Sequence, residues 1–233
     1  MENLFYAPDI ATIPELPEEE ALHIERVLRL KKGDTITMTD GNGYFYSAII
    51  ENIRHGHCSI SILKRWPQNM LRDYDVHIAV APTKNIDRME WLVEKVTEIG
   101  IDTITFLRCR YSERKEIRLQ RLYKIAISAM KQSLKATLPQ INEMVDFKDF
   151  LSVDTKGVKM IAHCFDDIKK PVKNIYSLHH DALILIGPEG DFNRDEINTA
   201  LSAGFASISL GECRLRTETA ALIACHTIHL LNQ

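Results

Sequence analysis

The 233-residue sequence has no apolar run long enough to cross a membrane, which takes about 18 or more consecutive apolar residues. Its longest apolar stretches, 182–187 and 220–230, are short or interrupted by histidine. Ten glycines and eight prolines are too few for a collagen-like or low-complexity chain. The N-terminal segment is acidic, which argues against a signal or transit peptide. We therefore expect a cytoplasmic protein that does not associate with a membrane.

Cysteine is also scarce. The five residues are odd in number and widely spaced, and none forms a CxxC pair: Cys58, Cys109, Cys164, Cys213 and Cys225. This pattern argues against a disulfide framework or a zinc ribbon and favours small buried side chains. His226 and His229 stand three apart in a predicted helix, but a partly buried helix face explains them, so we expect no metal site.

Several common catalytic motifs are missing. The sequence has no GxGxxG after a first α/β strand, no GxxxxGK[ST], no GxSxG and no HExxH. These absences disfavour a dinucleotide-binding fold, a Walker-type phosphate loop, a serine hydrolase and a zinc protease.

The charge is unevenly distributed along the chain. The formal net charge is −3, yet residues 108–135 contain nine Lys or Arg against two Glu. A basic block in a mildly acidic protein is a candidate phosphate-binding face, although a solvated helix face would also explain it.

Residues 1–70 predict a small β-rich domain. The segment 17–30 has helical periodicity, and 34–40, 43–50 and 57–63 have strand composition. The Asp-Gly-Asn-Gly stretch at 40–43 predicts a tight hairpin. A linker is predicted over 64–73.

Residues 74–233 alternate strands with helices, which indicates a mostly parallel α/β sheet. The predicted strands are 75–81, 103–107, 141–147, 158–165, 182–187 and 205–210. The predicted helices are 86–100, 116–134, 193–204 and 217–231.

Two segments that follow predicted strands are unlike ordinary loops. Leu185–Phe192 reads LIGPEGDF and Leu210–Ala220 reads LGECRLRTETA. Glycine lets a backbone approach a ligand closely, and ligands bind at the carboxyl ends of strands in open α/β sheets. Thr217 or Thr219 is placed to cap the last helix. We therefore predict that the two segments together form a binding site.

These two segments, in this order, resemble the knotted (SPOUT-class) RNA methyltransferases, and within them the 16S ribosomal RNA uridine-N3 methyltransferase family. Three further segments are similar to that family: His23–Asp34, Lys84–Gly100 and Ala129–Pro139. The resemblance covers nearly the whole chain.

The resemblance implies an α/β protein with a C-terminal SPOUT domain (74–233) that contains a deep trefoil knot, plus a small N-terminal PUA-like β-barrel (1–70) that helps to hold RNA. It also implies a homodimer that uses S-adenosylmethionine to methylate N3 of a uridine in 16S ribosomal RNA, free or in the 30S subunit.

The candidate site residues fall into three groups. The catalytic candidates are Arg216 for anion stabilisation and Glu189 and Glu218 as bases, with a structural role at the helix N-terminus open for Glu218. The cofactor-binding candidates are Ile186, Gly187, Pro188, Glu189, Gly190, Leu210, Gly211, Leu215, Arg216, Thr217 and Thr219. The RNA-binding candidates are Arg26, Arg29, Lys84, Arg88, Arg110, Arg114 and Lys135.

Two departures from the family pattern stand out. Asp191 occupies the place of a second glycine, and Lys135 that of an arginine, which replaces a bidentate contact with a point charge. Two alternative functions stay open: a non-catalytic knotted protein that binds RNA or assists ribosome assembly, and a SPOUT methyltransferase that acts on another RNA.

Overall fold

The computed structural model describes residues 3–69, 72–153 and 155–233 and divides into two compact units. Unit 1 comprises Met1–Met70 and Ile127–Leu138, and unit 2 comprises Leu71–Ala126 and Pro139–Gln233. The domain boundary predicted at residue 70 lies outside the described residues. The sequence places 127–138 in the second domain, but its backbone pairs with unit 1. Gly43 N–H donates to the Ala136 carbonyl (2.8 Å) and Leu138 N–H to the Gly41 carbonyl (2.9 Å).

Unit 1 contains a four-stranded sheet in the order β1-β2-β3-β4. Its strands are β1 (Leu4–Tyr6), β2 (Thr35–Thr39), β3 (Tyr44–Arg54) and β4 (His57–Pro67). The hairpin predicted at 40–43 is confirmed, since β2 and β3 pair antiparallel on either side of it. The predicted linker is wrong at its start, because β4 continues to Pro67; its residues 70 and 71 lie outside the described part.

The helix predicted over 17–30 is shorter than expected. It consists of α1 (Glu18–Leu22) and a π-helical segment, η1 (His23–Leu28), which ends at Arg29 with φ +56°. Ala21 and Ile24 from this segment are buried with residues of β2, β3 and β4, including Met38, Ile50 and Ile60. The helix therefore covers one face of the small sheet.

Unit 2 is built on a seven-stranded sheet in the order β7-β6-β5-β10-β8-β11-β9, and its neighbouring strands pair in parallel. The strands are β5 (Val76–Val80), β6 (Thr103–Arg108), β7 (Gln140–Asp146), β8 (Val158–Ala162), β9 (Lys170–Pro171), β10 (Ala182–Ile186) and β11 (Ala206–Ser209). Its helices are α2 (Ile86–Ile99), α4 (Phe147–Ser152), α5 (Arg194–Ser202), α6 (Thr217–Leu231) and the 3-10 turn η2 (Val172–Asn174). Helix α3 (Leu119–Gln132) begins in unit 2, and its residues from Ile127 onward belong to unit 1. The predicted parallel α/β sheet is confirmed, whereas β1, β9, α4 and η2 were not predicted.

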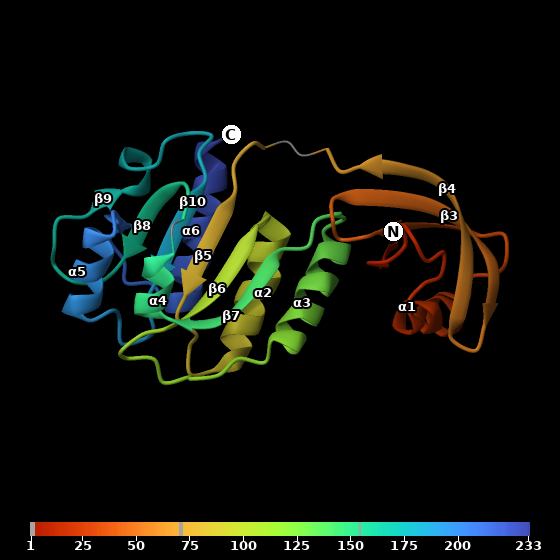
Figure 1. Ribbon diagram of the computed structural model, residues 1–233, viewed down its shortest axis with the longest axis horizontal. Coiled ribbons are helices and arrows are strands. Elements are labelled where there is room, and N and C mark those ends of the chain that lie inside the picture. Colours follow the sequence, from red (N-terminus) through yellow and green to blue (C-terminus); the bar gives the residue numbers. More distant parts are fainter. Residues whose placement is uncertain (1–2, 70–71, 154) are drawn as a thin grey trace. The chain divides into compact units, whose positions relative to one another are not determined.

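Helices cover both faces of this sheet (Figure 1). The helices α2 and α6 pack together on one face, and α4 and α5 pack together on the other. The central strand β10 is buried along its whole length because both of its faces are covered. The buried core on the face covered by α4 and α5 includes Phe147, Phe192 and Phe205.

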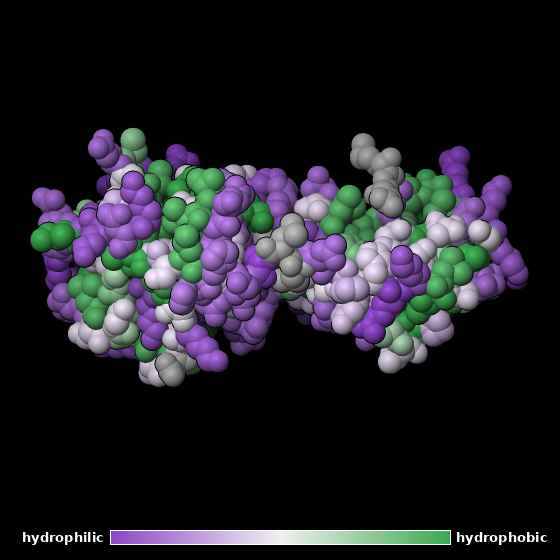
Figure 2. All heavy atoms as spheres, turned by 90° about the horizontal axis from the view of Figure 1, so that it is seen from above, coloured by the Kyte–Doolittle hydropathy of each residue, from purple (hydrophilic) through white to green (hydrophobic). Residues whose placement is uncertain are grey.

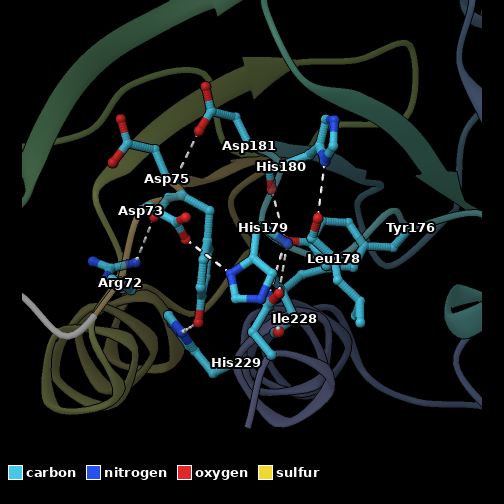
Figure 3. A network of polar contacts seen from close by, with 12 residues as sticks. Arg72, Asp73, Asp75, Tyr176, Leu178, His179, His180, Asp181, Ile228 and His229 are labelled. Carbon is cyan, nitrogen blue, oxygen red and sulfur yellow. Dashed lines mark hydrogen bonds and ion pairs between the residues drawn. The ribbon is translucent and has the colours of Figure 1, made fainter.

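A polar network connects the segments that precede β5 and β10 to the end of α6 (Figure 3). His179 N–H donates to Asn232 Oδ1 (2.8 Å), and the Tyr74 hydroxyl lies 2.9 Å from His229 Nδ1. Arg72 makes a bidentate pair with Asp102 (2.7 and 2.8 Å). These residues lie at the amino ends of β5 and β10. The network therefore holds the end of α6 at the edge of the sheet opposite the carboxyl ends of these strands.

Hydrophilic and hydrophobic side chains are mixed over the face shown in Figure 2. No helix in the described part of the chain is long and apolar enough to span a bilayer. Within the same described ranges, no group of three or more His, Cys, Asp or Glu is placed to hold a metal ion.

Candidate functional site

A cavity of about 560 Å³ opens in unit 2 at the carboxyl ends of β10, β8 and β11. These strands are parallel neighbours, so the loops that follow them meet at one edge of the sheet. The loops are 163–169, 187–192 and 210–216. The volume lies within the range of about 300–1,000 Å³ that is typical of small-molecule sites.

Most of the predicted cofactor-binding residues line this cavity. Those that do are Ile186, Gly187, Pro188, Glu189, Leu210, Gly211, Leu215, Arg216 and Thr217. Gly190 and Thr219 do not line it. A Cβ at Gly190 would instead lie 3.0 Å from the Cβ of Tyr111, so Gly190 makes room for that neighbouring side chain.

Thr217 connects the two loops that the sequence singles out. Its buried hydroxyl donates a hydrogen bond of 3.0 Å to the Gly187 carbonyl. The expected capping role of Thr217 or Thr219 is wrong, because Arg216 is the N-cap residue of α6 and no side chain caps that helix. The hydroxyl that was expected to satisfy the helix end holds the 187–192 loop instead.

Asp191 has a backbone conformation that favours glycine. Its φ is +66°, in the left-handed region that glycine occupies at little cost. Aspartate is among the side chains that tolerate this region. Its carboxylate accepts hydrogen bonds from Cys164 N–H (2.7 Å) and Phe192 N–H (2.8 Å). The substitution therefore adds a contact between the 163–169 and 187–192 loops.

Two glycines of the cavity are required for different reasons. A Cβ at Gly187 would lie 3.1 Å from both Phe192 N and Phe192 Cδ2, so a side chain there would require Phe192 to shift. Gly211 has φ +124°, and a Cβ there would meet no atom within 4 Å. Gly211 is thus needed for its backbone conformation.

The 163–169 loop was missed by sequence reasoning, which extended the strand through 165. Its cavity-lining residues are His163, Cys164 and Lys169. His163 is 7% exposed, and its Nε2 lies 2.9 Å from the Ser207 hydroxyl. Burial lowers the pKa of His163, so the neutral ring is favoured. Its Nδ1 is buried without a hydrogen-bond partner among the described residues. No glycine or proline marks this loop, so the pattern gave no signal for it.

The cysteines fall into two classes. Cys58, Cys109 and Cys225 are buried as expected, but Cys164 and Cys213 are exposed. The expectation that all five are buried is wrong for these two, because they lie on loops that line the cavity.

The three catalytic candidates are placed differently. Arg216 is exposed and lines the cavity, and its side chain makes no ion pair with any described residue. Glu189 also lines the cavity and accepts a hydrogen bond from Lys84 N–H (2.9 Å). Glu218 is buried, does not line the cavity and lies 3.7 Å from Arg88 on α2.

The predicted RNA-binding residues are distributed over both units. Arg26, Arg29 and Lys135 belong to unit 1, and Lys84, Arg88, Arg110 and Arg114 to unit 2. Lys84 pairs with Glu113 (2.8 Å), and Arg114 donates to the carbonyls of Thr83 (3.1 Å) and Lys84 (2.6 Å). Arg26, Arg29 and Arg110 are exposed and make no ion pair with a described residue.

The basic block is also partly neutralised. Arg108 pairs with Asp146 and Arg121 with Glu90 in unit 2, and Lys131 pairs with Glu20 in unit 1. The charge free for a polyanion is therefore smaller than the residue count suggests.

Comparison with known proteins identifies relatives of both parts of the chain. Residues 71–229 match a family model described as RNA methyltransferase domain, and residues 16–63 match one described as RNA methyltransferase PUA domain. The Ribosomal RNA small subunit methyltransferase E of Rickettsia conorii is 29% identical over 93% of this chain and 89% of its own length.

Solved structures are similar over the whole chain. A protein of Porphyromonas gingivalis, described as a probable rRNA-methyltransferase, is 45% identical with a TM-score of 0.95, over 99% of this chain and 98% of its own. The Ribosomal RNA small subunit methyltransferase E of Neisseria gonorrhoeae, bound to S-adenosyl methionine, is 25% identical with a TM-score of 0.88 over the same shares.

Proposed function

The chain belongs to the RNA methyltransferase family, and we propose that it methylates N3 of a uridine in 16S ribosomal RNA. It is a ribosomal RNA methyltransferase, and its cofactor is S-adenosylmethionine. The observation that carries the proposal is the cavity at the carboxyl ends of β10, β8 and β11, which the GPEGD and LGECRLRT loops line together.

The cavity fits the cofactor in size and chemistry. Its volume suits a small molecule, and Gly187, Leu210 and Gly211 line it. The unpartnered Nδ1 of His163 supplies a buried polar atom that a ligand group can satisfy, as buried polar atoms generally are. The residues that would hold the cofactor are Ile186, Gly187, Pro188, Leu210, Gly211 and Leu215, with His163 behind them. Bound there, S-adenosylmethionine supplies an electrophilic methyl group.

The proton of uridine N3 decides which side chains matter. N3 is protonated near neutral pH, so methylation requires loss of this proton or stabilisation of the resulting anion. Arg216 provides a permanent positive charge at the cavity, and we assign it to the developing anion. Glu189 is at the cavity as well and is the better placed proton acceptor. Glu218 faces Arg88 and acts as a positioning residue for the start of α6.

The finer features of the fold belong to the same proposal. We expect a trefoil knot in unit 2, and the insertion of β10 between the earlier strands β5 and β8 supports it. We expect a closed PUA-like barrel in unit 1. A homodimer is supported by Trp91 on α2 (41% exposed) and Leu230 on α6 (57% exposed), which lie on the two helices that cover one sheet face. The 30S subunit or its RNA is the expected partner.

The proposal is tested with small subunits from a strain that lacks the enzyme. Incubation with the protein and S-adenosylmethionine should yield N3-methyluridine in the 16S RNA, detected by mass spectrometry of nucleosides. Methylation at another atom or of another RNA would overturn the assigned substrate. The non-catalytic alternative predicts no cofactor binding in calorimetry and no product.

A further inference from the structure

We infer that the strand end formed by Tyr44, Phe45, Lys64, Arg65 and Trp66 in unit 1 is a binding surface for unpaired RNA, separate from the cofactor cavity. This inference rests on the proposed function, since it assumes an RNA substrate. We call these five residues the cation–aromatic strand end.

The aromatic side chains of this strand end are preorganised. Phe45 on β3 and Trp66 on β4 are directly opposite in the antiparallel register. Their ring centroids are 5.8 Å apart with an angle of 27° between the planes, and both are half-buried. A fixed pair of partly exposed rings offers a base a stacking partner at a low entropic cost, as in single-strand-binding proteins.

Two cations lie against these rings. Lys64 Nζ is 5.5 Å from the centroid of the Trp66 ring, and Arg65 Cζ is 3.6 Å from that of the Tyr44 ring. Both cations are exposed, and neither makes an ion pair with an acidic side chain of the described residues. Successive side chains of a strand point to opposite faces, so Lys64 and Arg65 place positive charge on both sides of the strand end.

The side chains around the strand end favour a polyanion over a second protein. Residues 41–50, 57–69 and 127–138 contain four Lys or Arg and no Asp or Glu, whereas residues 1–70 contain ten acids against seven bases. One of the four, Lys131, pairs with Glu20, so the excess of positive charge rests mainly on Lys64 and Arg65. Backbone bonds bring these segments together, with Gln68 N–H donating to Gly43 O (2.7 Å) and Gly43 N–H to Ala136 O (2.8 Å).

The nearest acid in sequence, Asp40, is turned inward. Its carboxylate accepts hydrogen bonds from Asn42 N–H (2.8 Å), Tyr44 N–H (3.2 Å) and the Tyr46 hydroxyl (3.1 Å). It is buried, so its charge is withheld from the surface. Proteins bind single-stranded RNA through such a combination of cations and aromatic rings, and no Asp40 carboxylate is exposed here to repel the phosphates.

The chain offers a direct probe, because Trp66 and Trp91 are its only tryptophans. In a Trp91→Phe parent, titration with octauridylate should quench the Trp66 fluorescence saturably. Anisotropy of labelled octauridylate should show about a 10-fold or greater loss of affinity for Trp66→Ala. Lys64→Ala should bind more weakly and with a shallower salt dependence. Arg54→Ala is the matched control, since Arg54 is an exposed cation at the opposite end of the same two strands, and it should bind like the parent.

Equal affinities of Trp66→Ala and the parent for octauridylate would overturn the inference. It would also be overturned if the Trp66 fluorescence were quenched by self-association of the protein in the absence of RNA. Methyl transfer to small-subunit RNA separates this outcome from failure of the proposed function. We expect Trp66→Ala to raise KM for RNA far more than it lowers kcat. A parent that binds octauridylate through Trp66 but methylates no RNA would refute the proposed function alone. A parent that methylates with no effect of Trp66 would refute the inference alone.

Discussion

The hydroxyl of Thr217 donates a hydrogen bond of 3.0 Å to the carbonyl of Gly187, thirty residues earlier in the chain. This bond joins the first residue of α6 to the first residue after β10, and both residues line the cavity. One buried hydroxyl therefore connects the two loops directly.

Thr217→Val should reduce both stability and cofactor affinity. The substitution keeps the shape of the side chain but leaves the buried Gly187 carbonyl without its donor, which costs about 1–3 kcal/mol. Urea denaturation and calorimetry with S-adenosylmethionine measure the two effects. Thr217→Ser keeps the hydroxyl and should restore most of both. Unchanged affinity in Thr217→Val would show that this bond does not position the loops.

Asp191 gives a second prediction, which concerns backbone strain. Both Asp191→Ala and Asp191→Gly lose the hydrogen bond to Cys164 N–H. Alanine still has a side chain in the left-handed backbone conformation, whereas glycine relieves that strain. The alanine variant should be less stable than the glycine variant by about 1 kcal/mol in urea denaturation. Equal stabilities would mean that the loop relaxes to another conformation.

Much of unit 2 could be predicted because its signals are local. The helix that ends at Gly100, with φ +120°, and the buried strand ALILI follow from one stretch of sequence each. Glycines that follow two predicted strands identified the two loops of the cavity, and the family resemblance added the ligand expected there.

The remainder depends on contacts between distant residues. The lining role of His163 follows from the placement of β8 between β10 and β11, which no local pattern encodes. The same holds for the pairing of 127–138 with Gly41 and Gly43, and for Glu218, whose carboxylate faces Arg88 rather than the cavity. A motif gives the identity of a residue, but only the packing of α6 on α2 decides which way its side chain points.

The cysteines allow a direct test of the cavity. In the native protein, 5,5′-dithiobis(2-nitrobenzoic acid) should react quickly with Cys164 and Cys213 only, because the other three thiols are buried. Burial also raises the pKa of Cys58 to about 11, which suppresses its reactive thiolate. S-adenosylmethionine should slow both fast reactions, since both thiols line the cavity. The Cys164→Ser/Cys213→Ser double variant should show no fast phase; protection that is absent in the parent would place the cofactor elsewhere.

His77 should make folding sensitive to acid. Its ring lies 2.8 Å from the Thr105 hydroxyl and packs edge-on against Phe150, and burial lowers its pKa to about 4. The unfolded chain binds the proton near pH 6.5 and the folded chain near pH 4, so this contribution is complete above pH 6.5 and is lost as the pH falls toward 4. Between pH 7.5 and pH 5 the loss is about 2 kcal/mol. Urea denaturation of His77→Gln should show a smaller decrease than the parent by this amount; parallel pH profiles would contradict the assignment.

Arg216 provides the sharpest test of the proposed chemistry. It is the N-cap residue of α6 and lines the cavity, and no described residue pairs with its charge. The cofactor is itself a cation, so a guanidinium is poorly suited to bind its sulfonium and better suited to the uridine anion. Arg216→Ala should remain folded and bind S-adenosylmethionine nearly as well as the parent. Its single-turnover rate of methyl transfer at saturating RNA should fall about 100- to 1000-fold, which corresponds to about 2.7–4 kcal/mol.

Arg216→Lys should recover only part of that rate, because the planar fork of donors is lost. The competing role for Arg216 is an ion pair between subunits of a dimer, which a sizing column run beside the assay detects. A variant that becomes monomeric would assign Arg216 to the interface, and a variant that methylates at the parental rate would remove it from catalysis. A slow dimeric variant with intact cofactor binding leaves stabilisation of the uridine anion as the role that fits its position.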